Sequence, residues 1–414
     1  MLNDKKVREN ILLQSIIQGA NFLFPLIALP YLIRVLGVEN YGVYVLAATT
    51  AMFFGVLCDY GFNLTGTRDV AAAKKNMGLI STLYSKVMAL KIIMSFLSFT
   101  TLLILTTLNH SVRENFLLYF FSFTFVIAQS FFPAWLFLGL EDSRIIATLN
   151  FISKFIFTAS LFIFVNKAGD AYIAAILNTI GALFSTLLAL AWLRYKYKIQ
   201  YSKTPISDLM RYAKDGVLVF LAQLKILLFS SSNIIILGAI AGSEAVGFYS
   251  SAEKLMRAVA QIQVPILTAI FPRIASMINE NRQKLAYLLK LILLYGCIGY
   301  LIVGAIVFIY APEITTSFFG PNLSPTVSLL RIIILCPTFI FLNNIFGTQI
   351  LLNLGKDKQY FIVLFVVGLL NLALCTFLSE LLGATGASIS LLISEGLVAL
   401  GMYLFSRQIF WRNI

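Results

Sequence analysis

The fold of this chain is indicated by a stretch of sequence that occurs twice. The first copy is Gly37-Val38-Glu39-Asn40-Tyr41-Gly42-Val43-Tyr44. The second copy, half a chain length further on, is Gly242-Ser243-Glu244-Ala245-Val246-Gly247-Phe248-Tyr249. Both have the pattern G-x-E-x-x-G-x-Y. A chain of 414 residues that repeats itself at half its length is predicted to consist of two similar lobes.

Two further pairs of residues repeat at the same offset: Gln18 matches Gln223, and Arg68 matches Arg273. Hydrophobic residues make up 59% of the chain and charged residues only 12%, whereas about a quarter of a soluble domain is charged. Apolar stretches of about 20 residues recur along the chain, and each is long enough to cross a bilayer as a helix. We therefore predict an all-α polytopic membrane protein with no soluble domain.

We predict twelve transmembrane helices, at residues 11–33, 43–62, 82–107, 116–140, 145–165, 171–193, 216–239, 247–272, 287–311, 326–352, 360–380 and 386–406. Six belong to an N-terminal lobe, residues 1–205, and six to a C-terminal lobe, residues 206–414. An even number of crossings returns the chain to its starting side, so the lobes have the same orientation. We expect a pseudo-twofold axis along the membrane normal and a central cavity between the lobes. The glycines of the repeated stretches are expected to form external turns.

The positive charges predict the orientation in the membrane. With both termini in the cytoplasm, most Lys and Arg residues outside the spans fall on the cytoplasmic side, and only Arg34, Arg113 and Lys167 fall outside. The net charge of +13 is therefore spread over loops and does not form the basic face of a nucleic-acid-binding protein. The basic segment 194–198 either contacts anionic lipid headgroups or serves only as a topology signal.

Ionisable residues inside the predicted spans are costly and indicate a functional cavity. The candidate cations for substrate binding are Lys91, Lys154, Lys225, Lys254, Arg257 and Arg331. The acidic candidates for binding a coupling ion are Asp59, Glu253 and Glu395, each within a predicted span. An excess of cations suits an anionic ligand, because Arg makes forked contacts with phosphate and Lys makes point-charge contacts. Glu253 and Arg257 are four residues apart and can alternatively form a structural ion pair.

Prolines within the spans and the absence of catalytic motifs also bear on the function. Prolines in the spans are expected to bend helices and so let the lobes open and close; they are Pro25, Pro30, Pro133, Pro265 and Pro337. The motif G-x-x-x-x-G-K-[ST], which would bind ATP phosphates, does not occur. One histidine and four scattered cysteines do not favour an enzyme, a metal site or a cofactor.

Several motifs carry a resemblance to a known family. They are Pro30-Tyr31-Leu32-Ile33-Arg34-Val35-Leu36-Gly37, Asp59-Tyr60-Gly61-Phe62 with Thr67-Arg68-Asp69, Trp135-Leu136-Phe137-Leu138-Gly139-Leu140-Glu141, Gly247-Phe248-Tyr249 with Ala252-Glu253-Lys254, and Phe271-Pro272-Arg273. Through them the chain resembles polysaccharide-biosynthesis flippases along essentially its whole length. It is most similar to the Wzx-type O-antigen flippases of Gram-negative bacteria.

The resemblance implies the fold of the multidrug/oligosaccharidyl-lipid/polysaccharide exporter superfamily, located in the bacterial inner membrane. It implies an undecaprenyl-diphosphate-linked oligosaccharide as substrate, moved from the cytoplasmic to the periplasmic leaflet. A polysaccharide polymerase and a chain-length regulator are the partners to expect, besides membrane lipids. Arg68 and Arg273 lie in the matching motifs at cytoplasmic helix ends. There they either meet the diphosphate as it is loaded or cap helix C-termini.

Two other functions fit the same sequence. The first is a cation-coupled drug or metabolite antiporter of the same fold, which would need buried carboxylates for its cations. The second is a membrane subunit that scaffolds a polymerase or glycosyltransferase complex without transporting anything. Lysines in the middle of spans do not favour the scaffold, which has no use for charges within the bilayer.

Overall fold

The computed structural model describes the backbone of residues 5–280, 282–321 and 323–411. Side chains are described for these residues except 5–22, 218, 222, 224–230, 279, 282 and 408–411. The chain forms two compact units, Met1–Leu227 (unit 1) and Leu228–Ile414 (unit 2), and the division falls within one long helix, α9. The boundary expected from the sequence, between residues 205 and 206, lies just before that helix.

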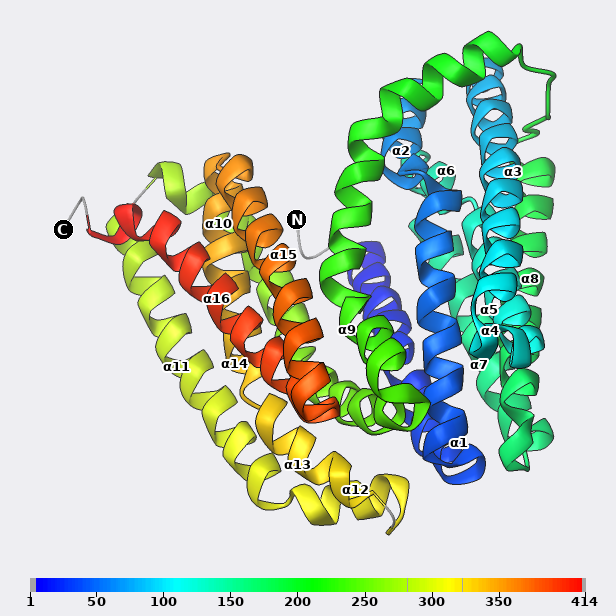
Figure 1. The fold of residues 1–414 in the computed structure, drawn as a ribbon. Helices are drawn as coiled ribbons and strands as arrows, with labels where there is room; N and C mark the ends of the chain where they lie inside the picture. The colour runs from blue at the N-terminus through cyan, green and yellow to red at the C-terminus, as the bar shows by residue number, and fades with distance from the viewer. Residues whose placement is uncertain (1–4, 281, 322, 412–414) are drawn as a thin grey trace. The chain divides into compact units, whose positions relative to one another are not determined.

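Unit 1 is built from helices alone in its described residues (Figure 1). Its elements are α1 (Lys5–Asp59), α2 (Phe62–Ala72), α3 (Met77–Leu108), α4 (His110–Glu114), α5 (Phe116–Phe131), α6 (Ala134–Gly139), α7 (Ser143–Phe164), a 3₁₀ turn η1 (Ala168–Asp170), α8 (Ala171–Lys196) and the first part of α9 (Ile206–Ala260). Trp135 and Phe137 of α6 are fully buried in a core that α2 and α3 share, and this core fixes the short helices beside the long ones.

Unit 2 is likewise helical throughout its described residues (Figure 1). After the second part of α9 come α10 (Gln263–Glu280), α11 (Arg282–Ile309), α12 (Ala311–Phe319), α13 (Ser324–Ile333), α14 (Cys336–Asn343), a π-helical segment η2 (Asn344–Leu351), a 3₁₀ turn η3 (Leu352–Leu354), α15 (Asp357–Leu382) and α16 (Ala384–Trp411). Its core includes Leu267, Phe341, Ile345 and Met402, which come from four of these elements.

The helices confirm a multi-pass membrane protein. Ten helices in the described part of the chain are long and apolar enough to cross a membrane. The first of them, Leu23–Ala72, contains two predicted spans, because the helix runs on at both sides of one kinked residue. The shorter apolar helix Gln263–Ile278 holds the second half of the predicted span 247–272. About twelve crossings are therefore consistent with the structure.

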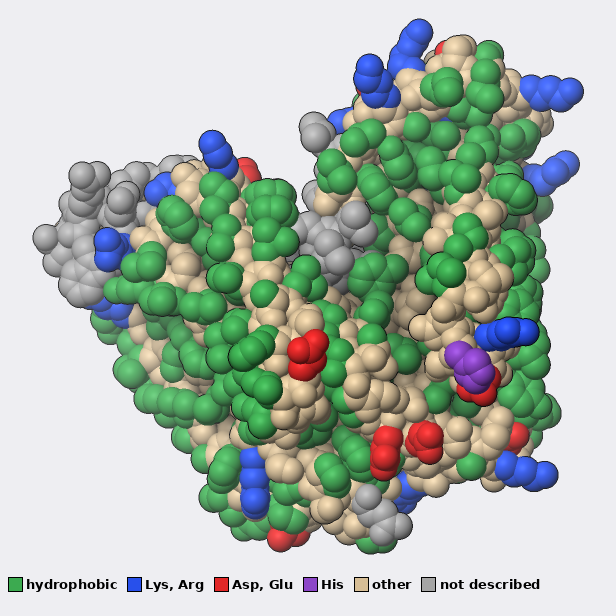
Figure 2. Space-filling model, viewed as in Figure 1, with side chains coloured by type: hydrophobic (Ala, Val, Ile, Leu, Met, Phe, Trp, Pro, Cys, Tyr) green, Lys and Arg blue, Asp and Glu red, His purple; other side chains and the backbone are tan. Residues whose placement is uncertain are grey.

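The surface is that of a protein in lipid. Figure 2 shows hydrophobic side chains over most of the visible face, with Lys and Arg mostly near helix ends. Phe96, Leu108, Ile163 and Phe377 are each more than half exposed. Apolar surface on this scale would be unfavourable in water, so it indicates contact with the hydrocarbon of a bilayer.

Both copies of the repeated stretch begin with a glycine that interrupts a helix in the same way. Gly37 has φ 75° and ψ 164°, and Gly242 has φ 82° and ψ 179°. Almost only glycine adopts this backbone conformation. The remaining residues of each octet are helical, so the expected turn is reduced to a single residue. The repeat in the sequence thus corresponds to a repeat in backbone geometry.

The prolines act less uniformly than the sequence predicts. Pro133 separates α5 from α6. Pro265 lies in the first turn of α10 and Pro337 in the first turn of α14, and each of these helices begins after a break in the chain's helical run. By contrast, α1 continues through Pro25 and Pro30. A proline at the start of a helix loses no hydrogen bond, because the first amides have no partner within the helix.

We expect Gly37→Ala and Gly242→Ala each to lower the free energy of unfolding by about 1–3 kcal/mol, because alanine is strained in this conformation. Beyond the adjacent backbone, no described atom lies within 4 Å of the added methyl group at either site, so neither a clash nor a new contact is expected to change the result. Gly299→Ala on α11 is the control, since it also adds a methyl group in open space but in a helical conformation. Thermal unfolding of the purified protein in detergent measures the effect. Equal stability of Gly37→Ala and Gly299→Ala would contradict it.

Candidate functional site

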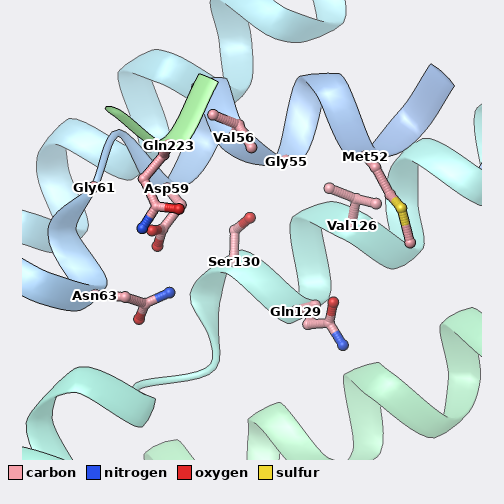
Figure 3. A pocket seen from close by; sticks show the side chains of 10 residues that line it. All are labelled: Met52, Gly55, Val56, Asp59, Gly61, Asn63, Val126, Gln129, Ser130 and Gln223. Atoms are coloured by element: carbon pink, nitrogen blue, oxygen red, sulfur yellow. The ribbon is translucent and has the colours of Figure 1, made fainter. Parts of the chain in front are cut away.

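Unit 1 contains a pocket of about 320 Å³ near the point where α1 ends and α2 begins (Figure 3). Its walls come from α1, the turn after it, α2, α5 and α9. The described residues that line it are Met52, Gly55, Val56, Asp59, Gly61, Asn63, Val126, Gln129, Ser130 and Gln223. Half of these residues are polar, and Asp59 alone among them is charged. The pocket therefore offers hydrogen-bonding groups inside an otherwise apolar bundle.

The turn after α1 shapes one wall of this pocket. Tyr60 and Gly61 both have positive φ, 49° and 79°, which ends the helix at Asp59. A Cβ atom on Gly61 would lie 3.2 Å from the backbone nitrogen of Phe220, so glycine is what lets α9 pack so closely. The rings of Tyr60 and Phe220 stack with their centroids 4.7 Å apart. This packing brings Gln223, one turn further along α9, to the pocket that Asp59 also lines.

Next to the pocket, Lys91 of α3 forms a buried ion pair with Asp59. Lys91 Nζ lies 3.0 Å from Asp59 Oδ1; the lysine side chain is fully buried, whereas 17% of the aspartate side chain is exposed. Lys91 Nζ also donates a hydrogen bond of 2.6 Å to the backbone carbonyl of Ser130. Moving a lone ammonium out of water costs several kcal/mol, and these two contacts offset that cost.

The carbonyl of Ser130 is available to Lys91 because the helix breaks just beyond it. In a continuous helix this carbonyl would accept a hydrogen bond from the amide of Ala134. That amide instead donates to the carbonyl of Phe132, at 2.9 Å, because Pro133 interrupts the helix. Lys91 thus satisfies a carbonyl that the break leaves without a helical partner, and it ties the end of α5 to the end of α1.

Three amide side chains also line the pocket: Asn63 from α2, Gln129 from α5 and Gln223 from α9. In the described part of the chain, none of them hydrogen-bonds to another protein group through its side chain. Each amide has an oxygen that accepts hydrogen bonds and an NH₂ group that donates two. These groups are therefore available to water or to a ligand.

Unit 2 contains a second group of charged residues. Arg257 of α9 places Nε 2.8 Å and a terminal nitrogen 2.6 Å from Oε1 of Glu253 on the same helix. Glu395 of α16 accepts a hydrogen bond of 2.8 Å from Asn343 Nδ2 and lies close enough to Arg257 and Glu253 to interact with both charges. Both carboxylates are buried. Two acidic groups around one arginine give this cluster a formal charge of −1, where the sequence suggests a positive interior.

A chain of neutral polar residues also crosses unit 2. Asn371 of α15 donates a hydrogen bond of 2.8 Å to Asn233 Oδ1 of α9 and accepts one of 2.9 Å from Ser394 Oγ of α16. All three residues are buried. Asn233 belongs to a polar run visible in the sequence, whereas Asn371 is not among the residues predicted from the sequence. An isolated asparagine in the middle of an apolar span is the signal that could have found it.

The other candidate cations lie on α7, α9 and α13. Lys154 on α7 is half-buried and has a protein partner, whereas Lys254 on α9 is exposed. Arg331 on α13 donates a hydrogen bond of 3.1 Å to the carbonyl of Phe308, and its guanidinium lies 5.2 Å from the centre of that ring. Lys225 lies outside the residues whose side chains are described.

The two arginines expected at the loading side are both exposed. Arg68 on α2 pairs with Asp69 at 2.9 Å, and Tyr212 of α9 donates a hydrogen bond of 2.9 Å to the same carboxylate. Arg273 lies on α10. The structure therefore brings together Lys91 with Asp59, and Glu253 with Arg257 and Glu395. Substrate contact by any of these residues stays a prediction.

Comparisons with known proteins point to one family. A family model described as polysaccharide biosynthesis protein matches residues 7–278. The chain is 31% identical over 409 residues to an Escherichia coli (strain K12) protein named "Putative O-antigen transporter", and the match covers 98% of each chain. The resemblance inferred from the sequence is confirmed by these matches.

Solved structures show the same fold. One is an inward-facing multidrug resistance MATE family transporter of the MOP superfamily, with a TM-score of 0.74 and 16% identity over 93% of this chain and 94% of that one. Another is the lipid II flippase MurJ in an inward closed conformation, with a TM-score of 0.70 and 15% identity over 95% of this chain and 87% of that one. At such low identity these likenesses concern the fold alone, and they confirm the all-α polytopic membrane fold.

We expect Lys91→Met to lower the free energy of unfolding by about 3 kcal/mol, because it leaves Asp59 without its partner in a largely buried position. Asp59→Asn combined with Lys91→Met should recover most of this loss, since no unpaired charge remains. Lys86→Met is the control. Lys86 pairs with Asp208 at 3.2 Å in a more exposed position, where an ion pair contributes about 1 kcal/mol or less to the free energy of unfolding. Thermal unfolding of the four proteins forms the test. A double variant less stable than Lys91→Met would contradict the pairing.

Proposed function

Because the chain belongs to the polysaccharide biosynthesis protein family, we propose that it is a flippase for an undecaprenyl-diphosphate-linked oligosaccharide, such as an O-antigen repeat unit. It moves this lipid from the cytoplasmic to the periplasmic leaflet of the bacterial inner membrane by alternating access, with both termini in the cytoplasm. The observation that carries the proposal is the match to a named O-antigen transporter over 98% of the chain. The fold, which a lipid II flippase shares, supports it.

The substrate has three parts, and the protein offers a different surface to each. The exposed apolar helix faces suit the polyprenyl chain, which stays in the lipid. The amides of the unit 1 pocket suit sugar hydroxyl groups. Cations are needed for the diphosphate.

Among the candidate cations whose side chains are described, Lys254 suits the diphosphate best. Its side chain is exposed, and it forms no ion pair in the described part of the chain. It also lies in the motif Ala252-Glu253-Lys254 that carries the family resemblance. Lys91 and Arg257 already face carboxylates, so each would have to leave its partner to bind phosphate. Arg68 and Arg273, both exposed, suit the first contact with the diphosphate during loading.

A second candidate function is a cation-coupled drug or metabolite antiporter. The cluster of Glu253, Arg257 and Glu395 favours it, because buried carboxylates with a net negative charge attract cations. The same carboxylates, or Asp59, are also where a flippase would bind a coupling ion. The cluster therefore does not distinguish an antiporter from a flippase. The identity of the transported molecule does.

Neither function makes the chain an enzyme or requires a cofactor. In the described part of the chain, no group of three or more His, Cys, Asp or Glu side chains could hold a metal ion. A flippase delivers its substrate to the enzymes that extend the polymer, so we expect a polysaccharide polymerase and a chain-length regulator as partners.

The test is deletion of the gene in its host. A flippase deletion should remove surface polysaccharide and cause undecaprenyl-diphosphate-linked repeat units to accumulate facing the cytoplasm. Mass spectrometry of extracted lipids detects this accumulation. An antiporter deletion should instead leave the polysaccharide intact and make the cells drug-sensitive. That second result would overturn the proposal.

In the complemented deletion strain, we expect Lys254→Gln to reduce surface polysaccharide by about tenfold or more, because a charged hydrogen bond to phosphate contributes about 1.5–3 kcal/mol. Lys290→Gln on α11 is the matched control, since it removes another exposed lysine without an ion pair in the described part of the chain. Polysaccharide is measured on gels at equal membrane levels of the proteins. A normal level with Lys254→Gln would remove Lys254 from the site.

A further inference from the structure

We infer that the unit 1 pocket is a binding site for an uncharged sugar ring of the substrate, and that Asp59, Gln129 and Gln223 bind its hydroxyl groups. This inference rests on the proposed function and deepens it, because it assigns the glycan and the diphosphate to different parts of the protein. The lining of the pocket, its charge and its size support this assignment.

The polar groups match a sugar in their chemistry. A hydroxyl group both donates and accepts a hydrogen bond, and so does an amide side chain. The amides of Asn63, Gln129 and Gln223 have no partner within the described part of the chain, so they bind a ligand without breaking protein contacts. The carboxylate of Asp59 adds an acceptor for two neighbouring hydroxyl groups.

Apolar side chains line the rest of the pocket. In Figure 3, Asp59, Asn63 and Gln223 are drawn toward one end of the pocket, and Met52 and Val126 toward the other. A sugar ring presents hydroxyl groups at its edge and C–H groups on its face, so it needs both kinds of surface. The volume of about 320 Å³ is at the lower end of the range for ligand pockets, about 300–1,000 Å³, and suits a short glycan better than a complete lipid-linked molecule.

The charge of the described lining residues disfavours the diphosphate. Among its described lining residues there is no Lys or Arg, and the charged one is the acidic Asp59. The nearby Lys91 is fully buried and directs its ammonium group to Asp59 and to the carbonyl of Ser130. Among the described side chains, a phosphate group in this pocket would meet a carboxylate and no available cation, whereas an uncharged sugar meets no such repulsion.

Lys91 has a different role here from the one predicted by the sequence. It is a positioning residue, because it holds Asp59 of α1 and the end of α5, which carries Gln129, in fixed places. Gly61 has a similar role for Gln223, since it allows α9 to approach the turn closely. Three of the polar groups are thus held by contacts outside the pocket itself.

The experiment measures binding to the purified protein in lipid nanodiscs by saturation-transfer NMR. The first probe is the repeat-unit oligosaccharide, released from its lipid by mild acid, and the second is undecaprenyl phosphate, which carries no sugar. The variant is Gln129→Ala with Gln223→Ala, neither of which removes a hydrogen bond within the described part of the chain. The control is Gln283→Ala, an exposed glutamine on α11.

We expect the double variant to bind the oligosaccharide about tenfold more weakly or worse, since it loses hydrogen bonds from two amides. Its binding of undecaprenyl phosphate should not change, and the control should bind both probes normally. Unchanged oligosaccharide binding in the double variant would overturn the inference. So would an equal loss for both probes, or displacement of the oligosaccharide by sodium ions, which would indicate a cation site.

The outcome is separable from that of the proposed function. If the wild-type protein binds the oligosaccharide at this pocket but the gene deletion leaves surface polysaccharide intact, the flippase proposal fails and the sugar site stands. If the deletion accumulates lipid-linked repeat units but the double variant binds the oligosaccharide normally, the flippase proposal stands and the sugar site fails.

Discussion

In the hydrocarbon of a bilayer, backbone amides and carbonyls have no water to bind, and each must find a partner within the protein. This constraint explains why the described chain is helical almost throughout, and why each break in a helix needs a local solution. At Gly37 and Gly242 the solution is a single residue in a conformation that only glycine adopts readily. At Pro133 it is the ammonium group of a lysine on another helix, which binds the carbonyl that the break exposes.

The same constraint governs charge. Lys91 and Arg257, two of the cations predicted near the middle of spans, each face a carboxylate, Asp59 and Glu253 respectively. Both pairs are formed between groups that would be costly alone in a nonpolar medium. Among the described side chains, the excess of cations counted in the sequence is therefore not gathered in one place within either unit. In unit 1 the pocket has an acidic lining, and in unit 2 the cluster around Arg257 is negative.

The fold could be predicted from the sequence because its signals are local. Long apolar runs predict helices, and the repeated octet predicts two similar halves. The pairing of Glu253 with Arg257 was foreseen as one alternative because the two residues are four apart on one helix. The pairing of Lys91 with Asp59 was not foreseen, because it depends on how α3 packs against α1. The amides of Asn63 and Gln129 were missed for a related reason: their significance comes from the pocket they share, which contacts between distant segments create.

The hydrogen bond between Lys91 and the carbonyl of Ser130 has a consequence for how this family can diverge. The lysine has that partner only because Pro133 interrupts α5. In a related protein with another residue in place of the proline, the helix could continue. The carbonyl of residue 130 would then accept a hydrogen bond from the backbone amide of residue 134. The lysine would then keep a single acceptor and become easier to lose. Positions 91 and 133, though far apart in the chain, should therefore covary among homologues.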